Sequence, residues 1–271
     1  MIKKSLSSIT ILIATVVYCL TVQSEAKSPN VLFLGDSITM HYSPTVIELM
    51  EGKAQVYRCK QNVTWTGRRL KEFLAGNLEA ENCQWDVVFF NVGNWDITPA
   101  DARFIRKNPD WKFVDGQPKT PIPEYEKNLA EIIRRIRTHS PGVKLVFTTT
   151  TFIPSVGAEG AVGVEAFNAA AIKVMKANDV PVFDLYSATK PHVGLLLYKD
   201  NTHFSKVANE GVIAPHVAAA LATFIDTGAL PSREAVTTLS IPKELIPALE
   251  KDRDLGHPKH RGKKKKQKKQ K

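Results

Sequence analysis

The chain has few cysteines and lacks several short catalytic motifs, and these absences narrow the class of protein. Its 271 residues include only three cysteines, which excludes a disulfide-rich scaffold. No Cys-x-x-Cys or His-Glu-x-x-His sequence occurs, so we expect neither a metal nor a cofactor. The Gly-x-Ser-x-Gly turn, which carries the serine of α/β-hydrolases, is also missing.

The N-terminus has the pattern of an export signal. A basic start with Lys3 and Lys4 precedes an apolar run over 9–22, and small residues, Ser24 and Ala26, stand where a signal peptidase cleaves. We therefore predict a signal peptide over 1–26 and a secreted or periplasmic location. A retained membrane anchor is the alternative, although the run is short for a membrane span.

The formal net charge of +10 is concentrated at the two ends of the chain. Residues 257–271 hold nine Lys or Arg and no acid, so they account for nine of the ten net positive charges. Most of the remaining charge belongs to residues 1–26. Such a tail cannot bury apolar surface, so we predict that it is disordered. It either contacts an anionic polymer or membrane surface or is simply solvated. We expect no specific nucleic-acid partner for an exported protein.

The remaining body, 27–256, alternates apolar strands with amphipathic helices. The expected strands are continuous in hydrophobicity, which is typical of a parallel sheet covered on both faces. Helical stripes include Tyr125 to Ile136 and a long C-terminal helix that Ser205 caps. This pattern predicts one α/β domain, a three-layer α/β/α sandwich with a five-stranded parallel sheet. The expected strands are 30–36, 55–59, 85–92, 143–151 and 180–186, and a last short helix is expected within 241–255.

Two connections, 96–123 and 152–163, are longer than a compact domain needs. Both follow strands at the carboxyl edge of the predicted sheet, where ligands bind in open α/β folds. They are either walls of a substrate site or ordinary surface decoration. Cys59 and Cys83 flank one helical unit, and the sequence does not decide whether they form a disulfide.

Two short motifs supply candidate catalytic residues. Gly35-Asp36-Ser37 follows the first apolar strand, which delivers the Ser37 hydroxyl to the carboxyl edge of the sheet. Asp200 and His203 stand three residues apart just before the last long helix. A serine hydroxyl needs a base within hydrogen-bond reach, His203 can supply it, and Asp200 can orient the imidazole. The alternative is that His203 and Asp200 are ordinary cap and turn residues.

These motifs resemble those of the SGNH (GDSL-type) hydrolase family. Gly35-Asp36-Ser37-Ile38 matches the first block of that family, Asp200-x-x-His203 matches the last, and the likeness extends over about 30–225. The resemblance implies a flavodoxin-like sheet of order 2-1-3-4-5 and ester hydrolysis through an acyl-serine. It assigns Ser37 as nucleophile, His203 as base and Asp200 as orienter.

The middle blocks depart from the family pattern. Gly93-Asn94-Trp95-Asp96 has Trp95 where the family has the asparagine that binds the oxyanion, although 90–96 is similar to a divergent branch with Phe-Asn-x-Gly-x-x-Asp. After the second strand, Asn62-Val63-Thr64 replaces a glycine, and the backbone N–H of Thr64 or Val63 is a substitute donor. The resulting oxyanion-hole candidates are Ser37, Thr64, Asn91 and Asn94, and the expected substrate-wall residues are Asp36, Asn62 and Trp95. His41 and His192 either lie near the site or are surface histidines, and we interpret both as surface histidines.

The leading hypothesis is an exported serine esterase that acts on small acyl groups, such as acetyl esters on carbohydrate. A lipid ester or thioester hydrolase with the same chemistry is the nearest alternative. A different class remains open, a glycan-binding protein on a hydrolase scaffold with weak catalysis, because Trp95 interrupts the oxyanion block. The expected partner is a small-molecule or glycan ester, and the oligomeric state is not predicted.

Overall fold

The structure is a computed structural model that describes residues 27–59, 63–67, 84–97, 118–152, 163–198 and 202–255. The predicted signal peptide and the Lys-rich tail lie outside these ranges and stay predictions. Most of the two long connections also lies outside them, since 98–117 and 153–162 are not described.

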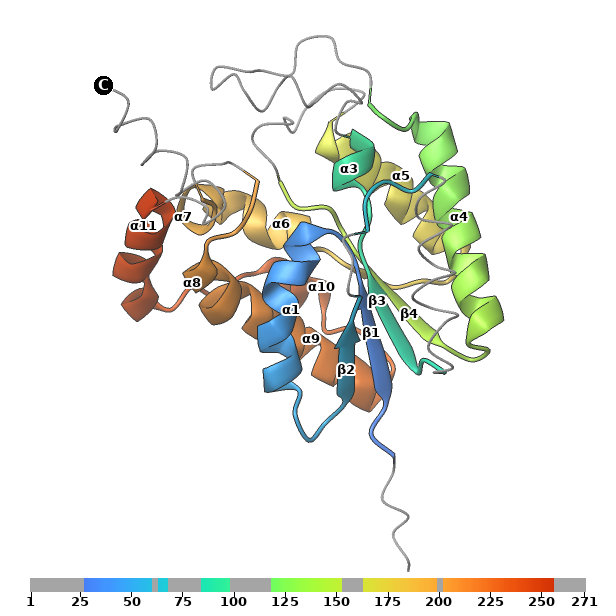
Figure 1. Ribbon diagram of the computed structural model, residues 1–271, viewed down its shortest axis with the longest axis horizontal. Coiled ribbons are helices and arrows are strands. Elements are labelled where there is room, and N and C mark those ends of the chain that lie inside the picture. Colours follow the sequence, from blue (N-terminus) through green and yellow to red (C-terminus); the bar gives the residue numbers. More distant parts are fainter. Residues whose placement is uncertain are drawn as a thin grey trace, which may run out of the picture.

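Five parallel strands form one sheet in the order β2-β1-β3-β4-β5, which confirms the predicted flavodoxin-like topology. Strand β1 lies between β2 and β3 and pairs with both (Figure 1). The strands are β1 (Asn30–Leu34), β2 (Gln55–Arg58), β3 (Val87–Phe90), β4 (Lys144–Thr148) and β5 (Val182–Phe183).

The continuous apolar runs form these strands because both faces of the sheet are covered. All four residues of β3 are buried, and Phe33 of β1 stacks on Phe89 of β3 with ring centroids 5.0 Å apart. On one face α1 contacts α9, and on the other α4 contacts α5 (Figure 1). The result is the predicted three-layer α/β/α sandwich.

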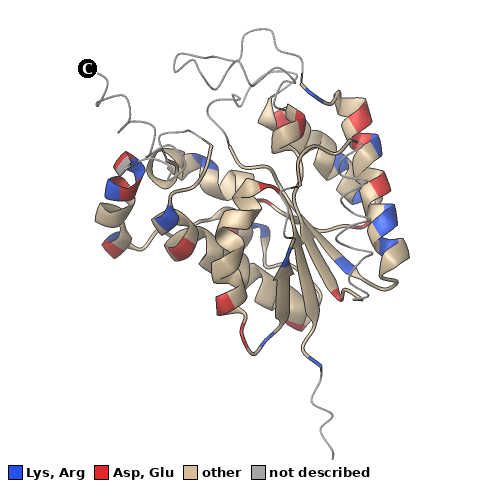
Figure 2. Ribbon diagram, in the orientation of Figure 1, with Lys and Arg blue, Asp and Glu red and all other residues tan. Residues whose placement is uncertain are grey.

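The helices match the predicted amphipathic stripes. The apolar stripe of α4 is fully buried, from Tyr125 to Ile136, whereas the same helix also carries acidic and basic residues, which Figure 2 marks in red and blue. The helices are α1 (Ser37–Leu49), α3 (Asn94–Ile97), α4 (Ile122–His139), α5 (Val164–Ala177), α6 (Leu185–Thr189), α7 (Val193–Leu196), α8 (Lys206–Ala208), α9 (Ala214–Thr227), α10 (Arg233–Thr237) and α11 (Ile246–Leu255).

The long C-terminal helix begins and ends as its sequence dictates. Ser205 caps α8 by accepting a hydrogen bond from the Ala208 N–H, as predicted. A π-helical turn over Asn209–Ile213 joins α8 to α9, which ends at Gly228 in the left-handed conformation. Among the described helices, Lys206–Thr227 is long and apolar enough to span a membrane, but 56% of its most apolar stretch is buried in this fold. We therefore interpret it as a core helix.

Candidate active site

Ser37 is the first residue of α1 and follows β1 after only two residues. Asp36 is the N-cap of that helix, and its carboxylate accepts a 2.9 Å hydrogen bond from the Ile38 N–H. A Cβ atom on Gly35 would collide with the Thr39 side chain, so the strand passes into the helix this tightly only with glycine. The turn places the Ser37 hydroxyl at the carboxyl edge of the sheet.

The structure brings Ser37 and His203 into direct contact although they are 166 positions apart. The distance from Ser37 Oγ to His203 Nε2 is 2.9 Å, within hydrogen-bond reach. The backbone around His203 is held by a short antiparallel pairing, in which the Tyr198 N–H donates to the His203 carbonyl at 2.9 Å. A neutral imidazole with its proton on Nδ1 can accept the serine proton at Nε2.

Two predicted site residues cannot be placed. Asp200, the predicted orienter, and Asn62, a predicted wall residue, lie outside the described residues. Cys83 also lies outside them, whereas Cys59 is a buried free thiol whose pKa is raised by burial. Within the described ranges, no three His, Cys, Asp or Glu side chains gather as a metal site would require.

Asp36, directly before Ser37, is buried rather than part of an open wall. Its side chain is buried, and this burial raises the pKa of the carboxyl, while the Ile38 N–H, the charge of His203 and the Asn94 side chain oppose the rise. Asn94, the first residue of α3, therefore lies against the residue that precedes Ser37. Of the predicted oxyanion donors, Asn94 is the side chain that the structure links to this turn.

The other predicted oxyanion donors differ in how their hydrogens are used. Asn91 donates to the Thr148 carbonyl at 2.7 Å, so this amide ties the end of β3 to β4. The Val63 N–H donates to the Gly35 carbonyl at 3.1 Å, which removes Val63 as a donor and leaves Thr64 beside it. Ser37 begins a helix, where the N–H groups have no partner within the helix.

Of the two alternatives for His41, the structure shows the position near the site. It is one helical turn after Ser37 on α1, and its ring centroid is 5.2 Å from that of His203. It is partly exposed, but it packs on the candidate base. The spacing of four residues on one helix was the signal that could have identified it.

Asp96 is a buried carboxylate that sequence reasoning did not single out. It accepts hydrogen bonds from the Thr66 backbone N–H at 3.0 Å and from the Thr66 hydroxyl at 2.6 Å, and from the side chain of Thr120. Burial raises the pKa of Asp96 to about 6, against the opposing effect of these bonds and of Lys119. Asp96 thus joins the segment after β2 to α3 and to the segment that precedes α4.

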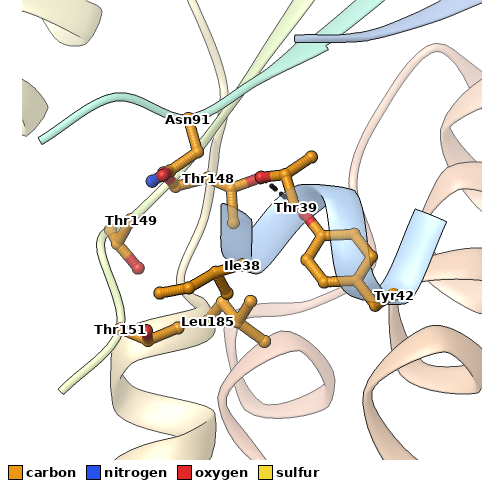
Figure 3. A pocket seen from close by; sticks show the side chains of 8 residues that line it. All are labelled: Ile38, Thr39, Tyr42, Asn91, Thr148, Thr149, Thr151 and Leu185. Atoms are coloured by element: carbon orange, nitrogen blue, oxygen red, sulfur yellow. Dashed lines mark hydrogen bonds between the residues drawn. The ribbon is translucent and has the colours of Figure 1, made fainter. Parts of the chain in front are cut away.

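A small pocket lies beside the start of α1 at the carboxyl edge of the sheet. Figure 3 shows Ile38 and Thr39 of α1 facing the ends of β3 and β4 across it. Among the described residues, the hydroxyls of Thr148 and Thr151 are buried without a hydrogen-bond partner. The pocket is lined by Ile38, Thr39, Tyr42, Asn91, Thr148, Thr149, Thr151 and Leu185.

Comparison with protein families finds one match that covers most of the folded body. The model of the GDSL-like lipase/acylhydrolase family matches residues 33–210, a range that includes both Ser37 and His203. A comparison with curated proteins finds no match.

Solved structures with the same fold include several esterases. A lipase/acylhydrolase from Enterococcus faecalis is 21% identical, with a TM-score of 0.53, and the match covers 76% of this chain and 99% of that one. The acetyl xylan esterase AlAXEase is 17% identical, with a TM-score of 0.54 and coverage of 71% and 99%. The psychrotrophic esterase EstA from Pseudoalteromonas sp., inhibited by monoethylphosphonate, is 12% identical, with a TM-score of 0.53 and coverage of 74% and 100%. At these identities the likeness concerns the fold.

Proposed function

Because the chain belongs to the GDSL-like lipase/acylhydrolase family and is a hydrolase of ester bonds, we propose that Ser37 and His203 carry its chemistry through an acyl-serine intermediate. The observation that carries this proposal is the 2.9 Å contact between Ser37 Oγ and His203 Nε2. It joins the two motifs that matched the first and last blocks of the family.

In the first half of the reaction, Ser37 Oγ attacks the ester carbonyl carbon while His203 Nε2 takes the hydroxyl proton. The carbonyl oxygen becomes an oxyanion. It is stabilised by the Ser37 N–H, by the Thr64 N–H and by the second amide hydrogen of Asn94, whose first hydrogen bonds Asp36. Asn94 thereby takes the role of the asparagine that the family has at the position of Trp95. When the tetrahedral intermediate collapses, the bond to the alcohol oxygen breaks, and His203 returns the proton to that oxygen.

In the second half, water replaces the alcohol. His203 removes a proton from the water as its oxygen attacks the acyl-serine, and then protonates Ser37 Oγ as the carboxylic acid leaves. Asp200 accepts the other ring N–H of His203 and stabilises the imidazolium. Its place three residues before His203 supports this role.

We propose a small acyl group, such as acetyl, carried on a carbohydrate. The small pocket that begins at Ile38, the residue after Ser37, supports a small acyl group, because its lining includes the buried hydroxyls of Thr148 and Thr151 and leaves little space. The lipid ester or thioester alternative requires room for a long chain. An acetyl xylan esterase is among the structures with this fold, which is compatible with a carbohydrate substrate but does not decide it.

The test compares the parent with Ser37→Ala on 4-nitrophenyl esters of increasing acyl length. We expect rapid hydrolysis of the acetate by the parent, a decline by the octanoate, and a loss of at least about a thousandfold in Ser37→Ala. Equal hydrolysis by the two proteins would remove Ser37 from the mechanism. Rates that rise with acyl length would favour the lipid alternative.

Export and the role of the tail belong to the same proposal. Residues 1–26 direct the protein out of the cytoplasm, and 257–271 hold it near anionic polymers or membranes by charge. N-terminal sequencing of the protein from its native host tests the first point, and a start at Lys27 is expected. Loss of salt-sensitive binding to anionic vesicles on deletion of 257–271 tests the second.

A further inference from the structure

The C-terminal helix α11 packs against the two short helices on either side of His203. Helix α7 ends at Leu196, α8 begins at Lys206, and His203 lies between them. Figure 1 shows α11 beside α7 and α8, and it contacts both of them. Residues 246–255 follow the range 33–210 that the family model matches, so the family match does not account for this helix.

Helix α11 is anchored to the fold by apolar contacts. Leu249 is fully buried. Leu245, the last residue of the turn that leads into α11, packs on Gly211 in the π-helical turn after α8. A Cβ atom on Gly211 would collide with Leu245, so the glycine lets this side chain lie directly against the helix backbone. The charged residues of α11 are therefore carried on a helix that is already held in place.

The first three N–H groups of α8 each donate to a side chain, and one of these side chains comes from α11. The Asp252 carboxylate accepts a 3.1 Å hydrogen bond from the Val207 N–H. The N–H groups before and after it donate to the Tyr198 hydroxyl, at 2.9 Å, and to the Ser205 hydroxyl, at 3.1 Å. Such groups have no partner within their own helix, so these side chains fix where the helix begins. That beginning lies three residues after His203.

The next residue of α11 contacts the other side of the same connection. Arg253 donates through Nη1 to the Gly194 carbonyl of α7 at 2.8 Å. The facing ends of α7 and α8 are also joined directly, because the Ser205 N–H donates to the carbonyl of the last residue of α7 at 2.8 Å. Adjacent residues of α11, Asp252 and Arg253, thus hold backbone groups on both sides of His203.

The position of His203 depends on the backbone between these two helices. Its carbonyl accepts a hydrogen bond from the Tyr198 N–H at 2.9 Å, so the two arms of the connection hold each other. Its Nε2 has to stay within reach of Ser37 Oγ, from which it lies 2.9 Å. A misplacement of about 1 Å can lower the rate of an enzyme by about a hundredfold. Groups that fix the ends of α7 and α8 therefore act on the geometry of the base.

We propose that Asp252 and Arg253 are positioning residues for His203, and that α11 braces the catalytic base. The inference rests on the proposed function, because it requires that His203 is the base. Asp252 acts by accepting the Val207 N–H, so an oxygen at this place is needed and a negative charge is not. Arg253 acts by donating to the carbonyl in α7.

The experiment measures kcat and KM for 4-nitrophenyl acetate in full-length variants, well below their melting temperatures. Asp252→Ala removes the acceptor and should lower kcat by about tenfold. KM should stay within about twofold of the parent, because the brace acts on the base and not on substrate binding. Asp252→Asn keeps an oxygen that can accept the Val207 N–H and should restore kcat to within about twofold of the parent.

Two control variants separate positioning from a general loss of stability. Arg253→Met should lower kcat by about threefold or more. Its matched control is Arg137→Met, because Arg137 is another surface arginine that donates to a backbone carbonyl, that of Asn178, at 2.7 Å. Ser232→Ala removes the N-cap of α10, so its melting temperature should fall as in Asp252→Ala. Both controls should keep the kcat of the parent.

Each outcome decides the inference. A folded Asp252→Ala with the kcat of the parent overturns the brace, and so does an Asp252→Asn that is as slow as Asp252→Ala. Control variants that lose as much kcat as the α11 variants overturn it too. Should Asp252→Ala fail to fold, the comparison of Arg253→Met with Arg137→Met decides alone.

The esterase function is tested separately by Ser37→Ala and His203→Ala on the same substrate. If both abolish hydrolysis while the α11 variants keep the kcat of the parent, only the brace fails. If hydrolysis survives in both, the proposed function fails and the brace with it.

Discussion

The buried carboxylate of Asp96 predicts an unusual dependence of stability on pH. Its pKa is about 6 in the folded protein against an ordinary value of 3.8, with burial as the largest cause. The folded state therefore holds this proton more tightly than the unfolded state does. The resulting stabilisation is fully present below about pH 4 and is lost as the pH rises through about 6.

The magnitude follows from the gap between the two pKa values. At about 1.4 kcal/mol per pKa unit the whole gap corresponds to about 3 kcal/mol, of which the parent loses about 2.5 kcal/mol of unfolding free energy between pH 4 and pH 7. Asp96→Asn has no such proton to lose. Its unfolding free energy relative to the parent should therefore rise by about 2.5 kcal/mol over the same interval, even though Asp96→Asn at pH 7 also lacks the charge-assisted bonds to Thr66, which are worth about 2 kcal/mol.

The assay is urea unfolding of both proteins at several pH values from 4 to 7, followed by circular dichroism. Asp226→Asn is the control, because Asp226 is exposed on α9, and its curve should follow that of the parent. A constant difference in unfolding free energy between Asp96→Asn and the parent across this range would refute the assignment of a raised pKa to Asp96.

Two further predictions concern the turn that carries Ser37. Gly35→Ala forces the Thr39 side chain to move and should lower the unfolding free energy by about 1–3 kcal/mol. Gly194→Ala is the control and should not destabilise the protein, because a Cβ there meets no atom within 4 Å. Equal melting temperatures of the two variants would contradict this. His41→Ala removes a ring packed on His203 and should lower kcat by about two- to tenfold with little change in melting temperature. An unchanged kcat would show that His41 does not position the base.

The fold was predictable from sequence because the strands are continuously apolar and the helices carry clear stripes. The short β5, only Val182–Phe183, was overestimated at 180–186, because residues from Asp184 onward cap and begin α6. Short helices such as α3 and α10 carry too few residues for a periodic signal.

The site was only partly predictable, because some of its groups are defined by contacts between distant residues. Ser37 and His203 stood in short motifs, and these motifs sufficed to pair them. The bonds from Asp96 to Thr66 span 30 positions and follow no local pattern, so the role of Asp96 in joining these segments was not predicted. The signal for His41 was local, but a histidine on a helix is more often a surface residue.

The most direct test of the account is the site at which an activated phosphonate ester reacts. Such a reagent phosphonylates a serine hydroxyl that a neighbouring base activates. The residue that carries the label therefore shows whether Ser37 is activated by His203. Peptide mapping by mass spectrometry should find the label on Ser37 alone in the parent, and labelling should be far slower in His203→Ala. A protein that hydrolyses esters but carries its label on another residue, or labels equally without His203, would contradict the account.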